Sequence, residues 1–390
     1  MEKGQTQLIR CIQIGLGWFP QQFGGLNKFF YDLWANLPMV DVSAIGMLAG
    51  DGKFQADAVK GIHFFASSSD SGLTRYFNSK RVLKRLVGDG PLDCFVSHFC
   101  LYTYPNMSLI KKSGKPLVVH FHGPWSQEGE VEGNQVHHSY LKKWIEKSVY
   151  THASKLITLS TAFRDILVKD YRISEDNVHV IPGGVDIGHF YPNLSRKEAR
   201  DTLNWPKDRP LLFVVRRHVQ RMGLENLIDS VAQLKRRFPD ILLMIGGKGP
   251  LSELLNRKIG ELGLQENIRM LGFIPDEILP VAYRASDLSI VPSIALEGFG
   301  LIVAESLASG TPCMVTPVGG MPEILREFSP DLILNGNGVE NITDGLSGWL
   351  SGKLKLPSRE ECVSYAQSKY NWQTVTGQIR EVYDLAISGK

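Results

Sequence analysis

The sequence predicts an α/β protein built from two doubly wound parallel sheets, one in each half of the chain. Short apolar runs typical of buried strands alternate with amphipathic, helix-like segments along the whole sequence, which is the pattern of successive βαβ units. A second series of such runs begins near Pro210, after a turn-rich stretch that follows Asp186. We therefore expect an N-terminal domain over residues 1–188 and a C-terminal domain over residues 189–370.

The expected strands are the apolar runs, and the expected helices lie between them, for example over residues 26–37 and 140–153. Because ligands bind at the carboxyl ends of strands in open α/β sheets, functional residues are expected in the loops that follow these runs. The expected strands are 11–17, 42–48, 92–98, 116–123, 155–160 and 178–184 in the first half, and 211–217, 241–247, 268–273, 288–293 and 312–317 in the second.

Composition excludes several classes of protein. The 390 residues are 43% hydrophobic and 21% charged, which is typical of a soluble globular chain. A net charge of +3 is too small to indicate a nucleic-acid partner, and no apolar run approaches the ~18 residues that span a bilayer. The start lacks the apolar core of a signal peptide, and the five scattered cysteines indicate reduced thiols, so a cytoplasmic protein is expected.

The most informative segment runs from Pro292 to Glu323. An expected strand ends there in a glycine-rich turn, and apolar residues then recur at helical spacing from Leu301 onward. Two carboxylates, Glu297 before the helix and Glu305 within it, lie eight positions apart. Free amides at a helix N-terminus suit a phosphate, and two nearby carboxylates suit paired sugar hydroxyls, so the segment favours a nucleotide sugar as ligand.

A longer pattern in this segment resembles the retaining nucleotide-sugar glycosyltransferases of family 4, which have the GT-B fold of two Rossmann-like domains. The family signature is Pro-Ser, then Glu-Gly-Phe-Gly-Leu, a second Glu separated from the first by seven residues, Gly-x-Pro, and Gly-Gly-x-x-Glu. The matching residues are Pro292, Ser293, Glu297, Gly298, Phe299, Gly300, Leu301, Glu305, Gly310, Pro312, Gly319, Gly320 and Glu323.

The resemblance implies a role for each half of the chain. The C-terminal domain would hold a UDP-, GDP- or ADP-sugar and the N-terminal domain a glycan or lipid-linked acceptor, the two facing each other across a cleft. Residues 371–390 resemble the last family helix, which joins the N-terminal domain. Glu305 would bind the ribose and Glu297 the donor sugar, without a cofactor or a metal. Four further residues would line the donor site: Gly298, Phe299, Gly300 and Leu301.

An arginine-rich loop follows the first expected strand of the second half. Arg217 and Arg221 lie near the carboxyl end of that strand, where guanidinium groups match the oxygens of a diphosphate; the alternative is a pair of solvated surface arginines. The family has an Arg and then a Lys in this loop, and Arg217 matches the Arg, whereas Met222 stands at the Lys position. Either Arg221 supplies the missing charge or the donor phosphate is held less tightly.

Two later turns complete the expected donor site. Gly249 lies in a Gly-x-Gly-Pro turn that would bring the backbone close to the nucleotide, although a purely structural turn explains this glycine nearly as well. The family recognises the nucleobase through backbone groups near Phe273. Such backbone contacts leave little trace in a sequence, so the sequence does not identify the nucleobase.

In the first half, Gly24 and Gly25 lie between a strand and a helix, where a sugar or phosphate can approach the backbone.

His120 and His122 alternate along an expected strand and so point the same way. His122 resembles the family histidine that contacts the donor sugar, whereas His120 is expected in the core and His98 at an ordinary polar position. No nearby Asp, Glu or Cys completes a ligand set, so no metal is predicted.

One basic run, with Lys80, Arg81, Lys84 and Arg85, lies near one face of an expected helix. Most such runs are solvated. Family members with lipid-linked acceptors, however, contact anionic membranes through basic patches, where each cation contributes about 1 kcal/mol. Peripheral contact with a membrane is therefore a hypothesis for this chain. Residues 326–344 are expected to form a long loop.

Other functions remain open. A phosphorylase or an epimerase can share the GT-B fold, and a non-catalytic sugar-nucleotide-binding protein would need the same donor site. A Rossmann dehydrogenase is not supported, because the first loop lacks the Gly-x-Gly-x-x-Gly spacing. The sequence identifies neither the sugar, the base nor the acceptor.

Overall fold

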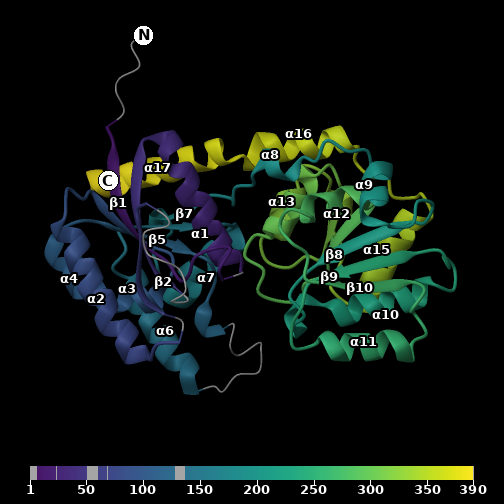
Figure 1. Ribbon diagram of the computed structural model, residues 1–390, viewed down its shortest axis with the longest axis horizontal. Helices are drawn as coiled ribbons and strands as arrows, with labels where there is room; N and C mark the ends of the chain where they lie inside the picture. The colour runs from purple at the N-terminus through teal and green to yellow at the C-terminus, as the bar shows by residue number, and fades with distance from the viewer. Residues whose placement is uncertain (1–6, 23, 51–59, 68, 128–136, 390) are drawn as a thin grey trace, which may run out of the picture. The chain divides into compact units, whose positions relative to one another are not determined.

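The computed structural model describes residues 7–22, 24–50, 60–67, 69–127 and 137–389 (Figure 1). The chain forms two compact units. The first comprises residues up to Gly184 together with the last segment from Trp372, and the second comprises Val185–Asn371. The second unit is therefore inserted into the first along the sequence.

The first unit contains a seven-stranded parallel sheet in the order β3-β2-β1-β4-β5-β6-β7. Each of the six strands expected in this half is present. The edge strand β3 was not expected, because its residues are only half-buried and their polarity is mixed. The strands are β1 (Ile9–Ile14), β2 (Val42–Gly50), β3 (Ile62–Ser67), β4 (Cys94–Ser97), β5 (Leu117–Phe121), β6 (Lys155–Thr158) and β7 (Val178–Val180).

Helices cover both faces of this sheet, so its strands are apolar on both sides, as is usual for parallel sheets. Two successive residues of β5 illustrate this burial on both faces: Val118 packs into one hydrophobic cluster and Val119 into another. The helical elements are α1 (Gly25–Asn36), η1 (Leu37–Val40), α2 (Gly72–Gly88), α3 (Cys100–Thr103), η2 (Tyr104–Asn106), α4 (Met107–Ser113), α6 (His137–Tyr150), α7 (Thr161–Tyr171), η3 (Glu175–Asn177) and α17 (Trp372–Ser388).

The last helix, α17, completes the core of the first unit. Its buried residues Trp372, Val375, Ile379 and Tyr383 pack into the same cluster as Val118. Arg380 anchors the helix, because its guanidinium donates to main-chain carbonyl groups that include that of Gln7, at 2.8 Å. The C-terminal segment is thus a structural part of the N-terminal unit.

The second unit contains a five-stranded parallel sheet in the order β10-β9-β8-β11-β12, and all five expected strands are present. Its strands are β8 (Leu211–Val215), β9 (Leu242–Gly246), β10 (Ile268–Gly272), β11 (Leu288–Val291) and β12 (Cys313–Val315). Its helical elements are α8 (Ile187–Phe190), α9 (Arg196–Leu203), η4 (Gln220–Met222), α10 (Leu224–Leu234), α11 (Ser252–Glu261), α12 (Leu279–Ala285), α13 (Leu301–Ala308), α14 (Met321–Leu325), η5 (Pro330–Leu332), α15 (Val339–Leu350) and α16 (Arg359–Tyr370). The predicted fold class is confirmed for both sheets.

The prediction of one long loop over residues 326–344 is wrong. The segment contains η5 and the first half of α15, and Ile333 forms a parallel bridge with Val315 of β12. Ile342 and Leu346 of α15 are fully buried, and the helix contacts α10. Glycines within α15 lower its helix propensity, so packing of its apolar side stabilises a helix that the sequence disfavours.

The strand order creates a switch point in each sheet. In the first sheet the chain moves from β1 to β2 and β3 on one side and then returns to β4 on the other; in the second it moves from β8 to β9 and β10 and returns to β11. The loops after β1 and β4, and after β8 and β11, therefore diverge and leave room for ligands.

Gly223 should be indispensable for the stability of the second unit. Its φ is +69°, and a Cβ would lie 1.9 Å from the carbonyl oxygen of Pro292. Gly352 has a similar φ of +71° with no atom within 4 Å of a Cβ, so it isolates the cost of backbone strain alone. We expect G352A to lower the free energy of unfolding by about 1 kcal/mol and G223A by about 3 kcal/mol or more.

Urea denaturation, monitored by circular dichroism, measures the free energy of unfolding of both variants. Equal destabilisation by the two variants would contradict the steric argument.

Candidate functional site

A buried ion pair occupies the switch point of the second sheet. Arg216 directly follows β8, Glu297 lies in the loop after β11, and a guanidinium nitrogen of Arg216 donates to Oε2 of Glu297. The side chains are only 8% and 13% exposed. Ser293 donates from its hydroxyl to the same carboxylate oxygen at 3.1 Å and accepts from Arg216 at 3.1 Å. The three groups form a closed polar cluster at the carboxyl edge of the sheet.

Arg216 is a residue that the sequence analysis missed. Two adjacent arginines end the β8 run, and the family resemblance selects Arg217. Both arginines follow Val215, the last residue of β8, and it is Arg216 whose guanidinium contacts Glu297. The side chain of Arg216 is buried, whereas Arg217 is exposed. No signal in the sequence separates these two adjacent arginines.

Met222, at the position where the family has Lys, is buried and packs against the same guanidinium. Its sulfur lies 3.0 Å from Nε of Arg216. A thioether is a weak hydrogen-bond acceptor and carries no charge. Met222 thus helps to hold Arg216 in place, a role that the sequence comparison with a lysine does not suggest.

Arg221 connects two loops of the site. Its Nη1 donates to the carbonyl of Leu296 at 3.1 Å, and its own carbonyl accepts from the amide of Ile294 at 2.9 Å. Leu296 adopts a left-handed conformation with φ +49°, which is uncommon for a non-glycine residue and is often found at functional sites. Arg221 stabilises this strained turn next to Glu297.

The glycines of the β11–α13 and β12–α14 loops permit close backbone contact. Gly320 donates its amide to the carbonyl of Glu297 at 3.1 Å, and a Cβ on Gly319 would lie 1.7 Å from that same oxygen. Gly300, with φ +83°, precedes α13, and no side chain caps the helix. Gly298 lies between Glu297 and these turns, so main-chain amides are concentrated beside the carboxylate.

Two predicted donor-binding residues are largely buried. Phe299 is 4% exposed and packs edge-on against Tyr370 at 5.6 Å between ring centroids, so only its backbone can face a ligand. Glu305 lies inside α13 and is 7% exposed. Burial, followed by the charge of Glu305, raises the pKa of Tyr283 well above its ordinary value. Leu301, the first residue of α13, is partly buried.

The turn after β9 is shaped by packing. A Cβ on Gly249 would lie 2.4 Å from the carbonyl oxygen of His218, so this glycine is required where two loops of the sheet edge touch. Phe273, which follows β10, is 48% exposed. The nucleotide-binding roles of both residues stay predictions.

In the first unit, His122 lies just beyond β5 and His98 just beyond β4, with His98 Nδ1 and His122 Nε2 3.2 Å apart. The expectation that His98 is an ordinary polar position is wrong, because it is 3% exposed and contacts both other histidines. Burial lowers the pKa of His122 to about 4, so its imidazole is neutral near pH 7. A Cβ on Gly24 or Gly25 would meet no atom within 4 Å, which leaves the backbone there accessible.

Among the residues that the structure describes, no cluster of three or more His, Cys, Asp or Glu side chains is arranged to hold a metal ion. Within the same residues, no helix combines the length and the apolar character needed to span a bilayer.

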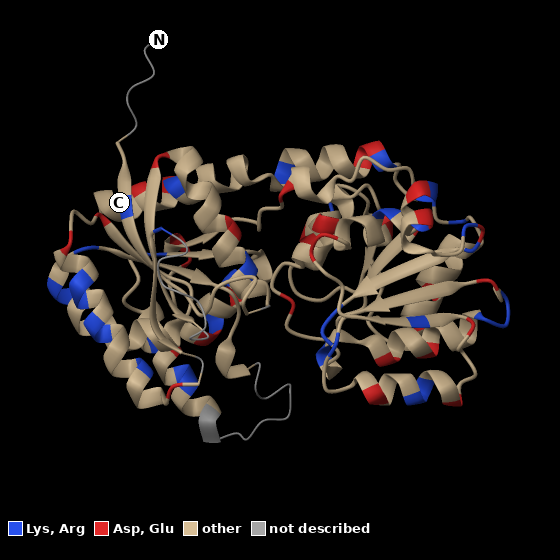
Figure 2. Ribbon diagram, viewed as in Figure 1, with Lys and Arg blue, Asp and Glu red and all other residues tan. Residues whose placement is uncertain are grey.

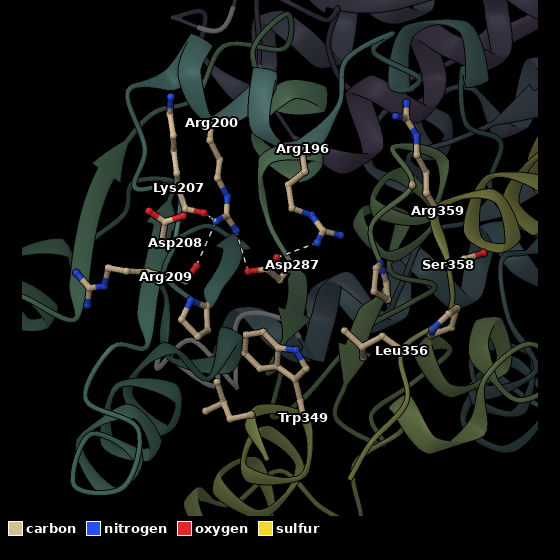
Figure 3. Close-up of a pocket in the computed structure, with 15 residues that line it drawn as sticks. Arg196, Arg200, Lys207, Asp208, Arg209, Asp287, Trp349, Leu356, Ser358 and Arg359 are labelled. Atoms are coloured by element: carbon tan, nitrogen blue, oxygen red, sulfur yellow. Dashed lines mark hydrogen bonds and ion pairs between the residues drawn. The ribbon is translucent and has the colours of Figure 1, made fainter. Parts of the chain in front are cut away.

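A cavity of about 560 Å³ lies at the opposite, amino edge of the second sheet (Figure 3). There Arg196 and Arg200 point toward Asp287, with nitrogen–oxygen distances of 2.9 and 2.8 Å. Asp287 also accepts from the amide of Leu211 at 2.8 Å, and Arg359 donates to main-chain carbonyls. These guanidinium groups tie strands, helices and loops together. The cavity lies away from the switch point and from the predicted site.

Comparison with known proteins agrees with this architecture. Residues 195–369 match the family described as Glycosyl transferases group 1, and residues 23–189 match Glycosyltransferase Family 4. An uncharacterized glycosyltransferase of Methanocaldococcus jannaschii is 28% identical over 240 residues, which is 60% of each chain. The aligned part of the chain thus spans less than two thirds of that relative.

Two further proteins extend the comparison. An MMP alpha-(1->4)-mannosyltransferase of Mycolicibacterium hassiacum is 27% identical over 328 residues, or 80% of this chain and 75% of that protein. The crystal structure of Anabaena HepE in complex with UDP has a TM-score of 0.78 at 19% identity and covers 97% of this chain and 100% of its own. The chain therefore belongs to the glycosyltransferases of group 1 and family 4 and has the GT-B fold.

Proposed function

We propose that the chain is a retaining glycosyltransferase that moves a sugar from a nucleoside-diphosphate sugar to a hydroxyl group of a glycan or lipid-linked acceptor. The observation that carries this proposal is the buried cluster of Arg216, Ser293 and Glu297 beside an uncapped helix start at the switch point of the second sheet. The UDP bound to HepE and the mannosyl transfer named for the Mycolicibacterium relative support a nucleotide sugar as donor.

The donor is proposed to lie along the carboxyl edge of the second sheet. The amides between Gly298 and Leu301 would bind the diphosphate, since helix N-termini attract anions. Glu305 would accept hydrogen bonds from the ribose hydroxyls, and Glu297 from hydroxyls of the transferred sugar. Arg216 keeps Glu297 paired and oriented, so the carboxylate is fixed before the sugar arrives.

Charge stabilisation would drive the chemistry. As the bond between the anomeric carbon and the diphosphate oxygen breaks, negative charge grows on the departing diphosphate, and Arg217 and Arg221 would stabilise it. The acceptor oxygen then bonds to the anomeric carbon on the same face, and its proton passes to the departing phosphate. No metal takes part in this scheme.

A nucleotide-binding and hydrolysis experiment tests the proposal. UDP, GDP and ADP would be titrated calorimetrically, and their sugars would be incubated with the protein to detect slow release of free sugar. We expect one of the three nucleotides to bind. E305Q should raise the dissociation constant of that nucleotide about tenfold or more, because a hydrogen bond to a charged carboxylate is lost. E305D, which keeps the charge, serves as the control.

The outcomes separate the alternatives. Binding without release or transfer of sugar would favour the non-catalytic sugar-nucleotide-binding protein. Dependence on added phosphate would favour a phosphorylase, and a changed sugar attached to the same nucleotide would favour an epimerase. No binding by any nucleotide would overturn the proposal.

Arg217→Ala should lower kcat about 100-fold, the cost of losing one preorganised charge partner for the leaving group. The KM for the donor should change much less, because the negative charge that Arg217 balances develops mainly in the transition state. Steady-state kinetics at saturating acceptor measure both quantities. Arg236→Ala, which removes another exposed arginine beyond α10, should leave kcat unchanged; a fully active Arg217→Ala would remove this residue from the mechanism.

We further propose that the protein reaches its acceptor at an anionic membrane surface, which it contacts through the exposed sides of α2 and α6. Both helices contact η2, and they expose large apolar side chains, with Phe77 64% and Trp144 54% exposed. Figure 2 shows basic residues along α2, which has no acid, and the one acid of α6, Glu146, is fully buried. Exposed aromatic and aliphatic residues among cations are typical of surfaces that insert into the lipid headgroup region.

Co-sedimentation with vesicles tests this surface. The protein should bind vesicles that contain phosphatidylglycerol and not those of phosphatidylcholine alone, and F77S combined with W144S should weaken binding about tenfold or more through lost apolar burial. The control is L254S combined with L262S, which alters exposed leucines at α11 of the other unit. Salt-insensitive binding, or none to anionic vesicles, would contradict the proposal.

A further inference from the structure

Three histidines form a stack at the carboxyl edge of the first sheet. The rings of His98 and His120 are parallel within 13° with centroids 4.4 Å apart, and His98 and His122 lie 5.5 Å apart at 22°. Phe29 and Phe30 of α1 pack against the stack, each with centroids 5.0 Å from one imidazole. The rings are therefore fixed by aromatic contacts on one side and by the sheet beneath them.

All three imidazoles are neutral near pH 7. Burial, reinforced by the neighbouring histidines, lowers the pKa of His98 and of His120 well below the ordinary value. Burial alone lowers that of His122 to about 4. A neutral imidazole carries one proton, on either Nδ1 or Nε2, so each ring is a donor at one nitrogen and an acceptor at the other.

The surroundings of His98 distinguish its two tautomers. Its Nδ1 lies 3.2 Å from Nε2 of His122, whereas its Nε2 is buried and has no hydrogen-bond partner among the described residues. A proton on Nε2 would leave a buried N–H group without an acceptor, which is rare and costly in proteins, while an unpaired ring lone pair is tolerated better. The proton of His98 therefore belongs on Nδ1.

The same reasoning applies to His120. Its Nε2 lies 3.2 Å from the hydroxyl of Tyr383 on α17, and its Nδ1 is buried without a partner among the residues that the structure describes. The proton accordingly belongs on Nε2, facing Tyr383. Among the described residues, each of these two buried rings thus directs its single N–H toward its hydrogen-bond partner, and neither has a second N–H for a ligand. His122, the partly exposed member, is the one that can face a substrate.

We propose that His98 is a positioning residue: it donates Nδ1–H to Nε2 of His122 and so fixes His122 as the Nδ1–H tautomer, with that N–H free to donate to an oxygen of the transferred sugar. The proposal rests on the glycosyltransferase function above and on the resemblance of His122 to the family histidine that contacts the donor sugar. It adds that a second histidine decides which nitrogen of His122 carries the proton. With the opposite tautomer, His122 would offer the sugar only a lone pair.

Nitrogen NMR of the full chain tests the tautomer directly. With ¹⁵N-labelled histidine, long-range ¹H–¹⁵N correlations report which ring nitrogen is protonated, and H122N identifies the His122 signals. We expect a protonated Nδ1 and an unprotonated Nε2 at His122. A protonated Nε2 at His122 in the unaltered protein would overturn the proposal, whether or not the protein is active.

Two substitutions of His98 separate positioning from packing. In H98N the side-chain amide can replace the Nδ1 donor, whereas H98L fills the space without a donor. We expect H98N to keep kcat within about twofold and the Nδ1–H signal of His122. H98L should mix the two tautomers and lower kcat about tenfold, with little change in the donor KM and with calorimetric nucleotide binding retained.

The outcomes distinguish the two proposals. An H98L protein that keeps both the pure tautomer and the rate would overturn the role of His98. If the unaltered protein bound no nucleotide but showed the expected tautomer, the glycosyltransferase proposal would fail while the hydrogen bond between the histidines stood. Thermal denaturation would reveal whether H98L folds. If it does not, the NMR spectrum of the unaltered protein and the kinetics of H98N still test the role of His98.

Discussion

The ion pair between Arg216 and Glu297 is the interaction on which the candidate site depends. Both side chains are almost excluded from solvent, and a buried charge without its partner is strongly unfavourable. The pair therefore forces the loops after β8 and β11 to remain together at the switch point. Ser293 and Met222 also contact the guanidinium, so several interactions hold it beside Glu297. A fixed carboxylate of this kind is what recognition of sugar hydroxyls requires.

The topology of the two sheets explains why polar residues gather where they do. Helices cover both faces of each sheet, so most positions within the strands are apolar, and polar groups gather mainly at the strand ends. In the first unit the histidines after β4 and β5 meet at one edge, and in the second unit the groups after β8, β11 and β12 meet at another. How the two units face each other across a cleft stays a prediction.

The sequence was sufficient for the fold class, because strands buried on both faces appear as continuous apolar runs and the signature around Glu297 is long. It was insufficient where geometry decides between similar residues. Arg216 and Arg217 are adjacent and chemically identical, and only the folded loop after β8 shows that Arg216 is the one that contacts Glu297. His98 and His122 are 24 positions apart, so their contact depends on the pairing of β4 with β5. Helix α15 was missed because its glycines disfavour a helix that tertiary packing nevertheless stabilises.

The course of the chain through the two units also constrains how the protein is made. During synthesis the seven strands of the first sheet emerge before the second unit, yet α17, which covers one face of that sheet and carries the hydroxyl that partners His120, emerges only after that unit. Until α17 has emerged and packed, the apolar residues of the N-terminal half that it covers stay exposed. The inserted unit has a contiguous sequence and can form its own core first. Formation of the histidine cluster is thus tied to synthesis of α17, and a premature stop codon anywhere in the second unit would remove that helix together with the hydroxyl that partners His120.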